Sequence, residues 1–196
     1  MELNLKGKKA LITGGSKGIG LAIKKALEEE GVECISWSRS EGVDLENDIP
    51  EIPDIDFLIN NVGGRGTWNE FNKIININLN PFLNLTHQFM ALGKIDGRII
   101  TIASIYGKEK GDNQTFTACK AFQIAMMKSL AGRCGKVTFN TICPGHIDVG
   151  KPFPYKPEKI GKPEDVANIV TFLCSDLASH INGACITVDG GESHAF

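Results

Sequence analysis

The glycine-rich segment Thr13-Gly14-Gly15-Ser16-Lys17-Gly18-Ile19-Gly20 contains the residue types that can hold a phosphate group. It follows an apolar run that predicts a strand, and a segment with helical periodicity begins at its end. A pyrophosphate needs a closely approaching backbone and the N–H groups of a helix N-terminus, and Gly14, Gly18 and Gly20 permit both. A simple tight turn is the alternative, but the strand–turn–helix context favours binding of a dinucleotide.

The end of the second predicted strand distinguishes the two nicotinamide cofactors, because the ribose 2′ position lies there. A carboxylate would accept hydrogen bonds from the 2′-hydroxyl of NAD, whereas the 2′-phosphate of NADP requires cations. The chain has Ser38-Arg39-Ser40 at this place, and Arg39 can bind a phosphate through two guanidinium N–H groups. Lys17, in the glycine loop, is a second cation. Either Arg39 or Lys17 alone could be a solvated surface charge. Together, without an acidic residue at the strand end, they favour NADP(H) over NAD(H).

The elements that must position these residues follow from the hydrophobic pattern. Apolar runs alternate with segments of helical periodicity, which predicts an α/β fold of the Rossmann type: a doubly wound parallel sheet of about seven strands with helices on both faces. The predicted strands are residues 9–13, 33–38, 42–45, 56–61, 97–103, 137–143 and 184–188. The predicted helices are residues 18–30, 68–92, 114–133 and 162–174. Pro81 predicts a kink or a break in the second helix. No composition shift marks a linker, so we expect residues 1–196 to form a single domain.

Composition and charge narrow the classes of partner. The formal net charge of −2 argues against a nucleic-acid or membrane-surface partner, since both usually show a basic excess. No apolar run reaches membrane-spanning length, and the N-terminus lacks the features of a signal peptide. The six cysteines show no metal-ligand spacing and are expected to be reduced thiols. The sequence therefore predicts a cytoplasmic protein without a metal site.

Further motifs appear along nearly the whole chain. The glycine loop has the spacing Gly-x-x-x-Gly-x-Gly, Asn60-Asn61-Val62-Gly63 follows the fourth predicted strand, Pro144-Gly145 follows the sixth, and Val188-Asp189-Gly190-Gly191 closes the last. In type and order these motifs resemble those of the short-chain dehydrogenase/reductase family. The resemblance implies cofactor contacts at Gly14, Ser16, Lys17, Gly18, Ile19, Gly20, Ser38, Arg39, Ser40, Asp44, Leu45, Asn60, Asn61, Val62, Gly63, Lys120, Pro144, Gly145 and Ile147.

The resemblance also implies a catalytic set of asparagine, serine, tyrosine and lysine. In this family the tyrosine exchanges the proton of the carbonyl or alcohol, and the serine polarises that oxygen. The lysine lowers the tyrosine pKa and holds the nicotinamide ribose, and the asparagine holds a water that links the lysine to solvent. Ser104, Lys120 and Asn78 match three of these positions. The tyrosine position is Phe116, four residues before the lysine and so on the same helix face.

Phe116 keeps the aromatic ring but has no hydroxyl. The loss of a general acid–base group typically lowers a rate by ~10²–10⁴, so the sequence predicts a chain that binds cofactor but is inactive or impaired. Three explanations are open: an engineered Tyr-to-Phe substitution, a natural member that became an NADPH-binding or regulatory protein, or a substitute group such as Tyr106 or Tyr155. The retention of the other three catalytic positions favours them in that order.

The remaining expectations concern the substrate and the assembly. In the family a segment after Pro144-Gly145 covers the substrate, and here it is short, at residues 150–160, so we expect a small carbonyl or alcohol compound. His146 either faces the pocket or caps a turn, and Val149 stands where the family commonly has a threonine. The resemblance implies a homodimer or homotetramer formed through the helices that carry Asn78 and Lys120.

Overall fold

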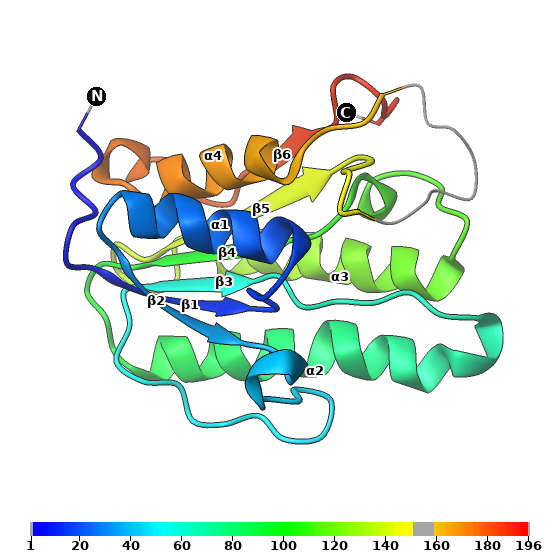
Figure 1. Ribbon diagram of the computed structural model, residues 1–196, viewed down its shortest axis with the longest axis horizontal. Helices are drawn as coiled ribbons and strands as arrows, with labels where there is room; N and C mark the ends of the chain where they lie inside the picture. Colours follow the sequence, from blue (N-terminus) through cyan, green and yellow to red (C-terminus); the bar gives the residue numbers. More distant parts are fainter. Residues whose placement is uncertain (1, 151–158, 196) are drawn as a thin grey trace.

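The computed structural model describes residues 2–150 and 159–195. Its centre is a parallel sheet with the strand order β2-β1-β3-β4-β5-β6 (Figure 1). The strands are β1 (Lys9–Thr13), β2 (Glu33–Trp37), β3 (Phe57–Asn60), β4 (Arg98–Ile102), β5 (Thr138–Pro144) and β6 (Cys185–Val188). The helices are α1 (Gly18–Glu29), α2 (Phe71–Ala91), α3 (Gln114–Leu130) and α4 (Pro163–Cys174), with short 3₁₀ turns η1 (Arg39–Glu41), η2 (Trp68–Glu70), η3 (Ile105–Gly107) and η4 (Asp176–Ala178).

The sheet is covered on both faces. Helices α1 and α4 lie on one face and α2 and α3 on the other (Figure 1). Because successive strand residues point to opposite faces, Ile12 and Ile59 pack beneath α1 and α4, whereas Leu11 and Leu58 pack beneath α2 and α3. Burial on both faces explains why the strands read as nearly continuous apolar runs. The predicted doubly wound α/β fold is confirmed.

The predicted strand at residues 42–45 is wrong, and the sheet of the described residues has six strands. Gly42 adopts a left-handed conformation with φ of 86°, which ends the 3₁₀ turn η1 and does not fit a strand. The Asp44 carboxylate then accepts hydrogen bonds from the Glu46 N–H and from the Asn47 side chain, at 3.2 and 3.0 Å. These local bonds form a turn instead of a strand, and β2 is left at the edge of the sheet.

Of the kink or break predicted at Pro81, the break is wrong, because α2 runs without interruption past this residue. Pro81 is itself buried, and Phe82, Leu85 and Phe89 from the following turns pack into the core. Burial of this apolar face compensates for the hydrogen bond that proline cannot donate.

None of the helices in the described part of the chain is long and apolar enough to cross a membrane. Across those same residues, no group of three or more His, Cys, Asp and Glu side chains is placed to hold a metal ion.

Candidate functional site

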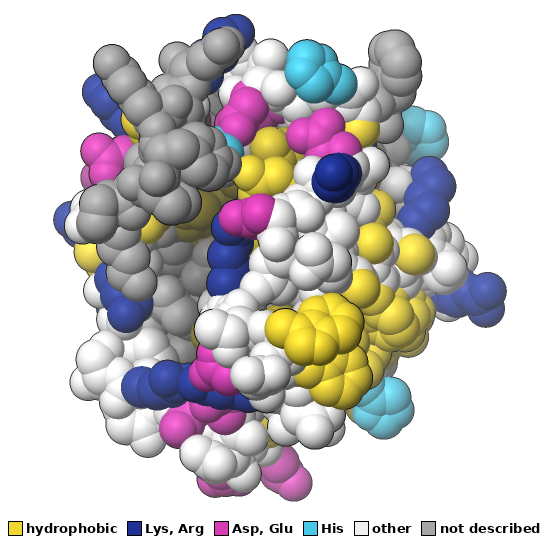
Figure 2. Space-filling view, turned by 90° about the vertical axis from the view of Figure 1, so that its right-hand side faces the viewer, with side chains coloured by type: hydrophobic (Ala, Val, Ile, Leu, Met, Phe, Trp, Pro, Cys, Tyr) yellow, Lys and Arg dark blue, Asp and Glu magenta, His cyan; other side chains and the backbone are white. Residues whose placement is uncertain are grey.

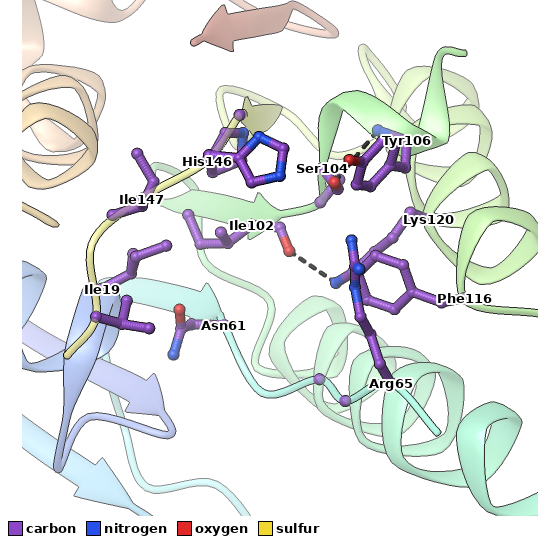
Figure 3. Close-up of a pocket in the computed structure, with 16 residues that line it drawn as sticks. Ile19, Asn61, Arg65, Ile102, Ser104, Tyr106, Phe116, Lys120, His146 and Ile147 are labelled. Carbon is purple, nitrogen blue, oxygen red and sulfur yellow. Dashed lines mark hydrogen bonds between the residues drawn. The ribbon is translucent and has the colours of Figure 1, made fainter. Parts of the chain in front are cut away.

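The candidate site lies at the carboxyl ends of the strands. From β1 the chain passes outward to β2 and then returns to β3 on the other side of β1, which creates the crevice where doubly wound sheets bind ligands. A cavity of about 660 Å³ opens there (Figure 3). Its lining includes Asn61, Arg65, Ser104, Phe116, Lys120 and His146. Seen from this side, the face is hollowed, with basic and hydrophobic side chains in and around the hollow (Figure 2).

The glycine loop has the geometry expected of a phosphate cradle. A Cβ atom added at Gly20 would lie 2.2 Å from the Gly14 carbonyl oxygen, and Gly14 itself has a left-handed φ of 70°. Helix α1 begins immediately after Lys17. The Lys17 side chain makes no capping hydrogen bond to the backbone N–H groups of the first helical turn. Two smaller cavities, of about 270 and 480 Å³, extend along this loop.

Thr13 fixes this loop to the neighbouring strand and was missed by sequence reasoning. Its hydroxyl accepts the backbone N–H groups of Asn61 and Val62, both at 2.9 Å, and the Asn61 amide donates to the Thr13 carbonyl. Asn61 thereby reaches the cavity, whereas Asn60 does not. The buried Asn60 side chain donates instead to the Thr86 hydroxyl at 3.1 Å, on the α2 side of the sheet.

The 480 Å³ cavity is lined by residues that the sequence predicts to contact the cofactor at and near its ribose 2′ position. They include Lys17, Ser38, Arg39 and Asp44. Arg39 forms ion pairs with Asp44 at 3.2 Å and with Glu46 at 2.9 Å, so its guanidinium is held at the cavity by two acidic neighbours. The other predicted cofactor residues that line this cavity are Gly14, Ser16, Ser40, Leu45, Val62 and Gly63.

Glu41 places a carboxylate near the end of β2 that the sequence did not lead us to expect. It accepts hydrogen bonds from the Ser36 hydroxyl at 2.6 Å and the Ser38 hydroxyl at 2.5 Å, and these bonds lower its pKa. The carboxylate is directed at the two serines, and Glu41 does not line the cavity.

Lys120 is fully buried at the floor of the main cavity. Its ammonium donates to the Ile102 carbonyl oxygen at 3.0 Å (Figure 3). It also donates to the Gln123 side-chain oxygen at 3.0 Å. The Gln123 amide in turn donates to the Asn78 carbonyl oxygen at 2.8 Å. Sequence reasoning missed Gln123, which links the predicted lysine to the predicted asparagine.

Asn78 stands behind the cavity and does not line it. Its side chain donates to the Gly64 carbonyl oxygen at 2.8 Å and accepts the Gly64 N–H at 3.3 Å. Asn76 and Asn80, its neighbours on α2, are exposed. The buried Asn78 therefore holds the loop after β3 in position.

Burial has a measurable consequence for Lys120. Desolvation lowers its pKa from the ordinary 10.5 to about 8. Between these two pH values the unfolded chain binds more protons than the folded chain, so this residue makes stability rise with pH from about 8 to about 10. We expect the difference in unfolding free energy between the wild type and Lys120→Met to increase by ~3 kcal/mol across this range. Chemical denaturation at several pH values measures it, and a pH-independent difference would contradict the assignment.

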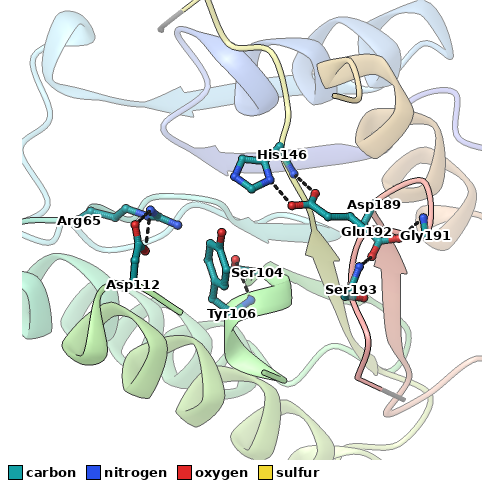
Figure 4. Close-up of polar contacts among 9 residues, drawn as sticks. All are labelled: Arg65, Ser104, Tyr106, Asp112, His146, Asp189, Gly191, Glu192 and Ser193. Atoms are coloured by element: carbon teal, nitrogen blue, oxygen red, sulfur yellow. Dashed lines mark hydrogen bonds and ion pairs between the residues drawn. The ribbon is translucent and has the colours of Figure 1, made fainter. Parts of the chain in front are cut away.

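The Phe116 ring lies beside Lys120, but it has no hydroxyl whose pKa the Lys120 ammonium could lower. The ammonium is 5.5 Å from the centre of the Phe116 ring. The guanidinium of Arg65 lies 4.9 Å from the same ring and 5.0 Å from the Tyr106 ring, and it forms an ion pair with Asp112 at 3.2 Å (Figure 4). Arg65 follows the Asn-Asn-Val-Gly motif by two residues, but nothing in its local sequence indicated that it enters the cavity.

His146 faces the cavity, which decides between its two predicted placements. Its Nδ1 contacts the Glu192 carboxylate, and its backbone N–H donates to the other oxygen of that carboxylate at 3.0 Å (Figure 4). A Cβ atom at residue 145 would lie 2.6 Å from Glu192, so Gly145 leaves the room for this contact. Pro144, Gly145, Ile147 and Val149 also line the cavity, but residues 151–158 of the predicted substrate-covering segment, Tyr155 included, lie outside the described residues.

Comparisons with known proteins show the family to which this chain belongs. Residues 44–193 match the family model described as enoyl-(acyl carrier protein) reductase. The chain is 33% identical to acetoacetyl-CoA reductase from Shinella zoogloeoides, over 93% of this chain and 97% of that protein. The chain belongs to the short-chain dehydrogenase/reductase family. It is also 31% identical to the 3-oxoacyl-[acyl-carrier-protein] reductase FabG from Vibrio harveyi, over 96% of this chain and 98% of that protein.

Solved structures of this family have the same fold. Ligand-free aldohexose dehydrogenase from Thermoplasma acidophilum superposes with a TM-score of 0.84 at 26% identity, over 97% of this chain and 96% of the other. A putative 2-deoxy-d-gluconate 3-dehydrogenase from Agrobacterium tumefaciens, with bound NADP, has a TM-score of 0.85 at 25% identity, over 97% and 98%. The alignment to the Shinella reductase spans 238 residues, whereas this chain has 196. The Shinella reductase therefore contains residues that have no counterpart in this chain.

Proposed function

We propose that this chain is an NADP(H)-dependent oxidoreductase that transfers a hydride between the nicotinamide and a small carbonyl or alcohol compound, with turnover slowed by Phe116. The observation that carries the proposal is that Ser104, Phe116 and Lys120 line one cavity that continues into the glycine loop. The Agrobacterium relative, whose structure contains NADP, supports the choice of cofactor.

The residues present fit a dinucleotide. The close approach at Gly20 leaves no room for a side chain, and Lys17 and Arg39 at the 480 Å³ cavity supply cations for a 2′-phosphate. Lys120 would hold the nicotinamide ribose, and the backbone at Ile147 would hold the carboxamide. When bound, the cofactor supplies or accepts the hydride.

Ser104 is placed to polarise the substrate oxygen. Its hydroxyl oxygen accepts the Tyr106 N–H at 3.2 Å, which leaves the hydroxyl hydrogen available for a carbonyl oxygen in the cavity. The buried positive charge of Lys120 lies 5.5 Å from the Phe116 ring. It stabilises the negative charge that develops on the substrate oxygen in the cavity. What position 116 does not provide is a proton.

Phe116 also favours a second candidate function, a non-catalytic NADPH-binding or regulatory protein. Fluorescence titration with NADPH, together with NADPH oxidation on a panel of carbonyl compounds headed by acetoacetyl-CoA, separates the two. Binding with turnover supports the oxidoreductase, and binding without turnover, also after Phe116→Tyr, supports the binding protein. A chain that fails to bind NADPH would contradict both.

Arg39 gives a direct test of the cofactor choice. A hydrogen bond to a charged group contributes about 1.5–3 kcal/mol, so Arg39→Gln is expected to weaken NADPH binding roughly 10- to 100-fold. NADH binding should change little, because NADH has no 2′-phosphate. Parallel fluorescence titrations with the two cofactors measure this, and equal losses for both would contradict a 2′-phosphate contact.

We further propose that the chain forms a homodimer or homotetramer through α2 and α3, and that it works in the cytoplasm. The Phe122 side chain on α3 is 42% exposed, whereas Leu130 on the same helix belongs to the core. All six cysteines are free thiols, which suits a reducing compartment. Sedimentation velocity of the wild type and Phe122→Glu tests the assembly.

A further inference from the structure

The absence of a hydroxyl at position 116 raises the question of which group exchanges the substrate proton. The question rests on the proposed oxidoreductase function. In reduction, the carbonyl carbon receives a hydride and the oxygen must receive a proton, so the cavity needs an acid that can lose one and regain it. The cavity residues with exchangeable protons beside Ser104 include Arg65, Tyr106, Lys120 and His146.

Arg65 and Lys120 are poor proton donors for this step. A guanidinium group in a protein does not give up a proton, so Arg65 can polarise an oxygen but cannot deliver a proton to it. The ammonium of Lys120 donates to the Ile102 carbonyl and to Gln123 at 3.0 Å each. Two of its three N–H groups are therefore committed to protein oxygens.

His146 has the arrangement of an oriented acid–base group. Its side chain is only 11% exposed, and Nδ1 is held by the Glu192 carboxylate. A carboxylate on Nδ1 fixes the orientation of the imidazole ring, so Nε2 is the nitrogen that we assign to proton exchange. The His146 ring stands perpendicular to the Tyr106 ring, with centroids 6.2 Å apart, and Tyr106 adjoins Ser104 (Figures 3 and 4).

Glu192 is itself fixed by the chain around it. The Asp189 carboxylate accepts the N–H groups of Gly191 at 2.8 Å and Ser193 at 2.7 Å, which closes a turn with Glu192 between them. The missing side chain at Gly145 lets the carboxylate approach both the ring and the backbone of His146. The turn at Asp189 and the missing side chain at Gly145 thus place a carboxylate on one nitrogen of a cavity-lining imidazole.

We propose that His146, oriented by Glu192, is the catalytic acid–base residue of this chain in place of the absent tyrosine hydroxyl. In reduction, the carbonyl carbon would receive the hydride that bound NADPH supplies, and the electron pair of the C=O π bond would move to oxygen. That oxygen takes the proton from Nε2 of the imidazolium. The products are the alcohol, NADP⁺ and neutral His146, which regains its proton from solvent. Oxidation runs through the same steps in reverse.

A double-mutant cycle between positions 146 and 116 tests this proposal. NADPH oxidation is measured with acetoacetyl-CoA and the carbonyl panel for the wild type, His146→Gln, Phe116→Tyr and the double variant. His146→Gln is expected to lower kcat by ~10² or more, with the Kd for NADPH unchanged. In the Phe116→Tyr background the same change should cost less than tenfold, because the tyrosine now supplies the proton. A purely structural role would give equal losses in both backgrounds.

Further variants locate the effect. Glu192→Gln should lower kcat in the same direction but less, as expected of a positioning residue, and the exposed His180→Gln is the matched control that should change nothing. Tyr106→Phe and Tyr155→Phe should retain most of the wild-type rate.

The outcomes separate this inference from the function on which it rests. Wild-type turnover that survives His146→Gln, or that is lost in a tyrosine variant instead, overturns the inference and leaves the oxidoreductase standing. If the wild type has no turnover but Phe116→Tyr is active, the inference is likewise overturned and the oxidoreductase function stands. If neither chain turns over any compound although NADPH binds, the oxidoreductase function is overturned, and the inference falls with it.

Discussion

Phe116→Tyr is expected to raise the rate of carbonyl reduction by ~10²–10⁴. The substitution adds one hydroxyl to a ring that already lies beside Lys120, whose ammonium is 5.5 Å from the ring centre. A nearby cation lowers the pKa of a phenol and makes it a better acid at neutral pH. Steady-state NADPH oxidation at saturating NADPH measures the gain, and it should appear in kcat, because cofactor contacts are unchanged.

Phe122→Tyr is the matched control for this substitution. It adds the same hydroxyl to an exposed phenylalanine of the same helix, away from the cavity, and should leave kcat unchanged. If Phe116→Tyr binds NADPH normally but gains no activity, the remaining site is not an assembled hydride-transfer site that lacks a single group. Together with the cycle at His146, this comparison shows how much of the proton transfer position 116 could supply.

Gly20→Ala is expected to cost about 3 kcal/mol or more of stability and to weaken NADPH binding in parallel. The added Cβ would lie 2.2 Å from the Gly14 carbonyl oxygen and 2.6 Å from the Asn61 side chain. Because the closest atom belongs to the backbone, the helix and the loop must separate, and overpacking of this kind typically costs ~1–3 kcal/mol and sometimes more. Urea denaturation and NADPH titration measure the two effects.

Gly64→Ala provides the comparison for Gly20→Ala. A Cβ at Gly64 would meet only the Ile77 side chain, at an ordinary contact distance of 3.5 Å. Its stability should therefore change by less than ~1 kcal/mol. If the two variants were equally stable, the close approach of α1 to the glycine loop would not be the feature that requires glycine at position 20.

The parts of the site that sequence could predict are those determined by neighbouring residues. The glycine loop joins one strand to the following helix, so its pattern is contained in eight consecutive residues. Phe116 and Lys120 share a helix face because they are four residues apart. The alternation of buried strands and helices was sufficient to predict the doubly wound sheet.

The parts that sequence could not predict depend on contacts between distant segments. Arg65 pairs with Asp112 across 47 positions of the chain, and His146 meets Glu192 across 46. Neither pair has a local pattern, because tertiary packing alone brings the loops together at the strand ends. The error at residues 42–45 was local instead: hydrogen bonds to Asp44 and the left-handed Gly42 outweigh the weak preference of this segment for a strand.

We propose above that the glycine loop and the end of β2 form an NADP(H) site that opens into the cavity of Ser104 and Lys120. Titration of the wild-type chain with NADPH and, in parallel, with NADH tests it most directly. We expect saturable binding of both cofactors, with NADPH bound at least tenfold more tightly, because of one charged contact to the 2′-phosphate. Absence of NADPH binding, or tighter binding of NADH, would contradict it.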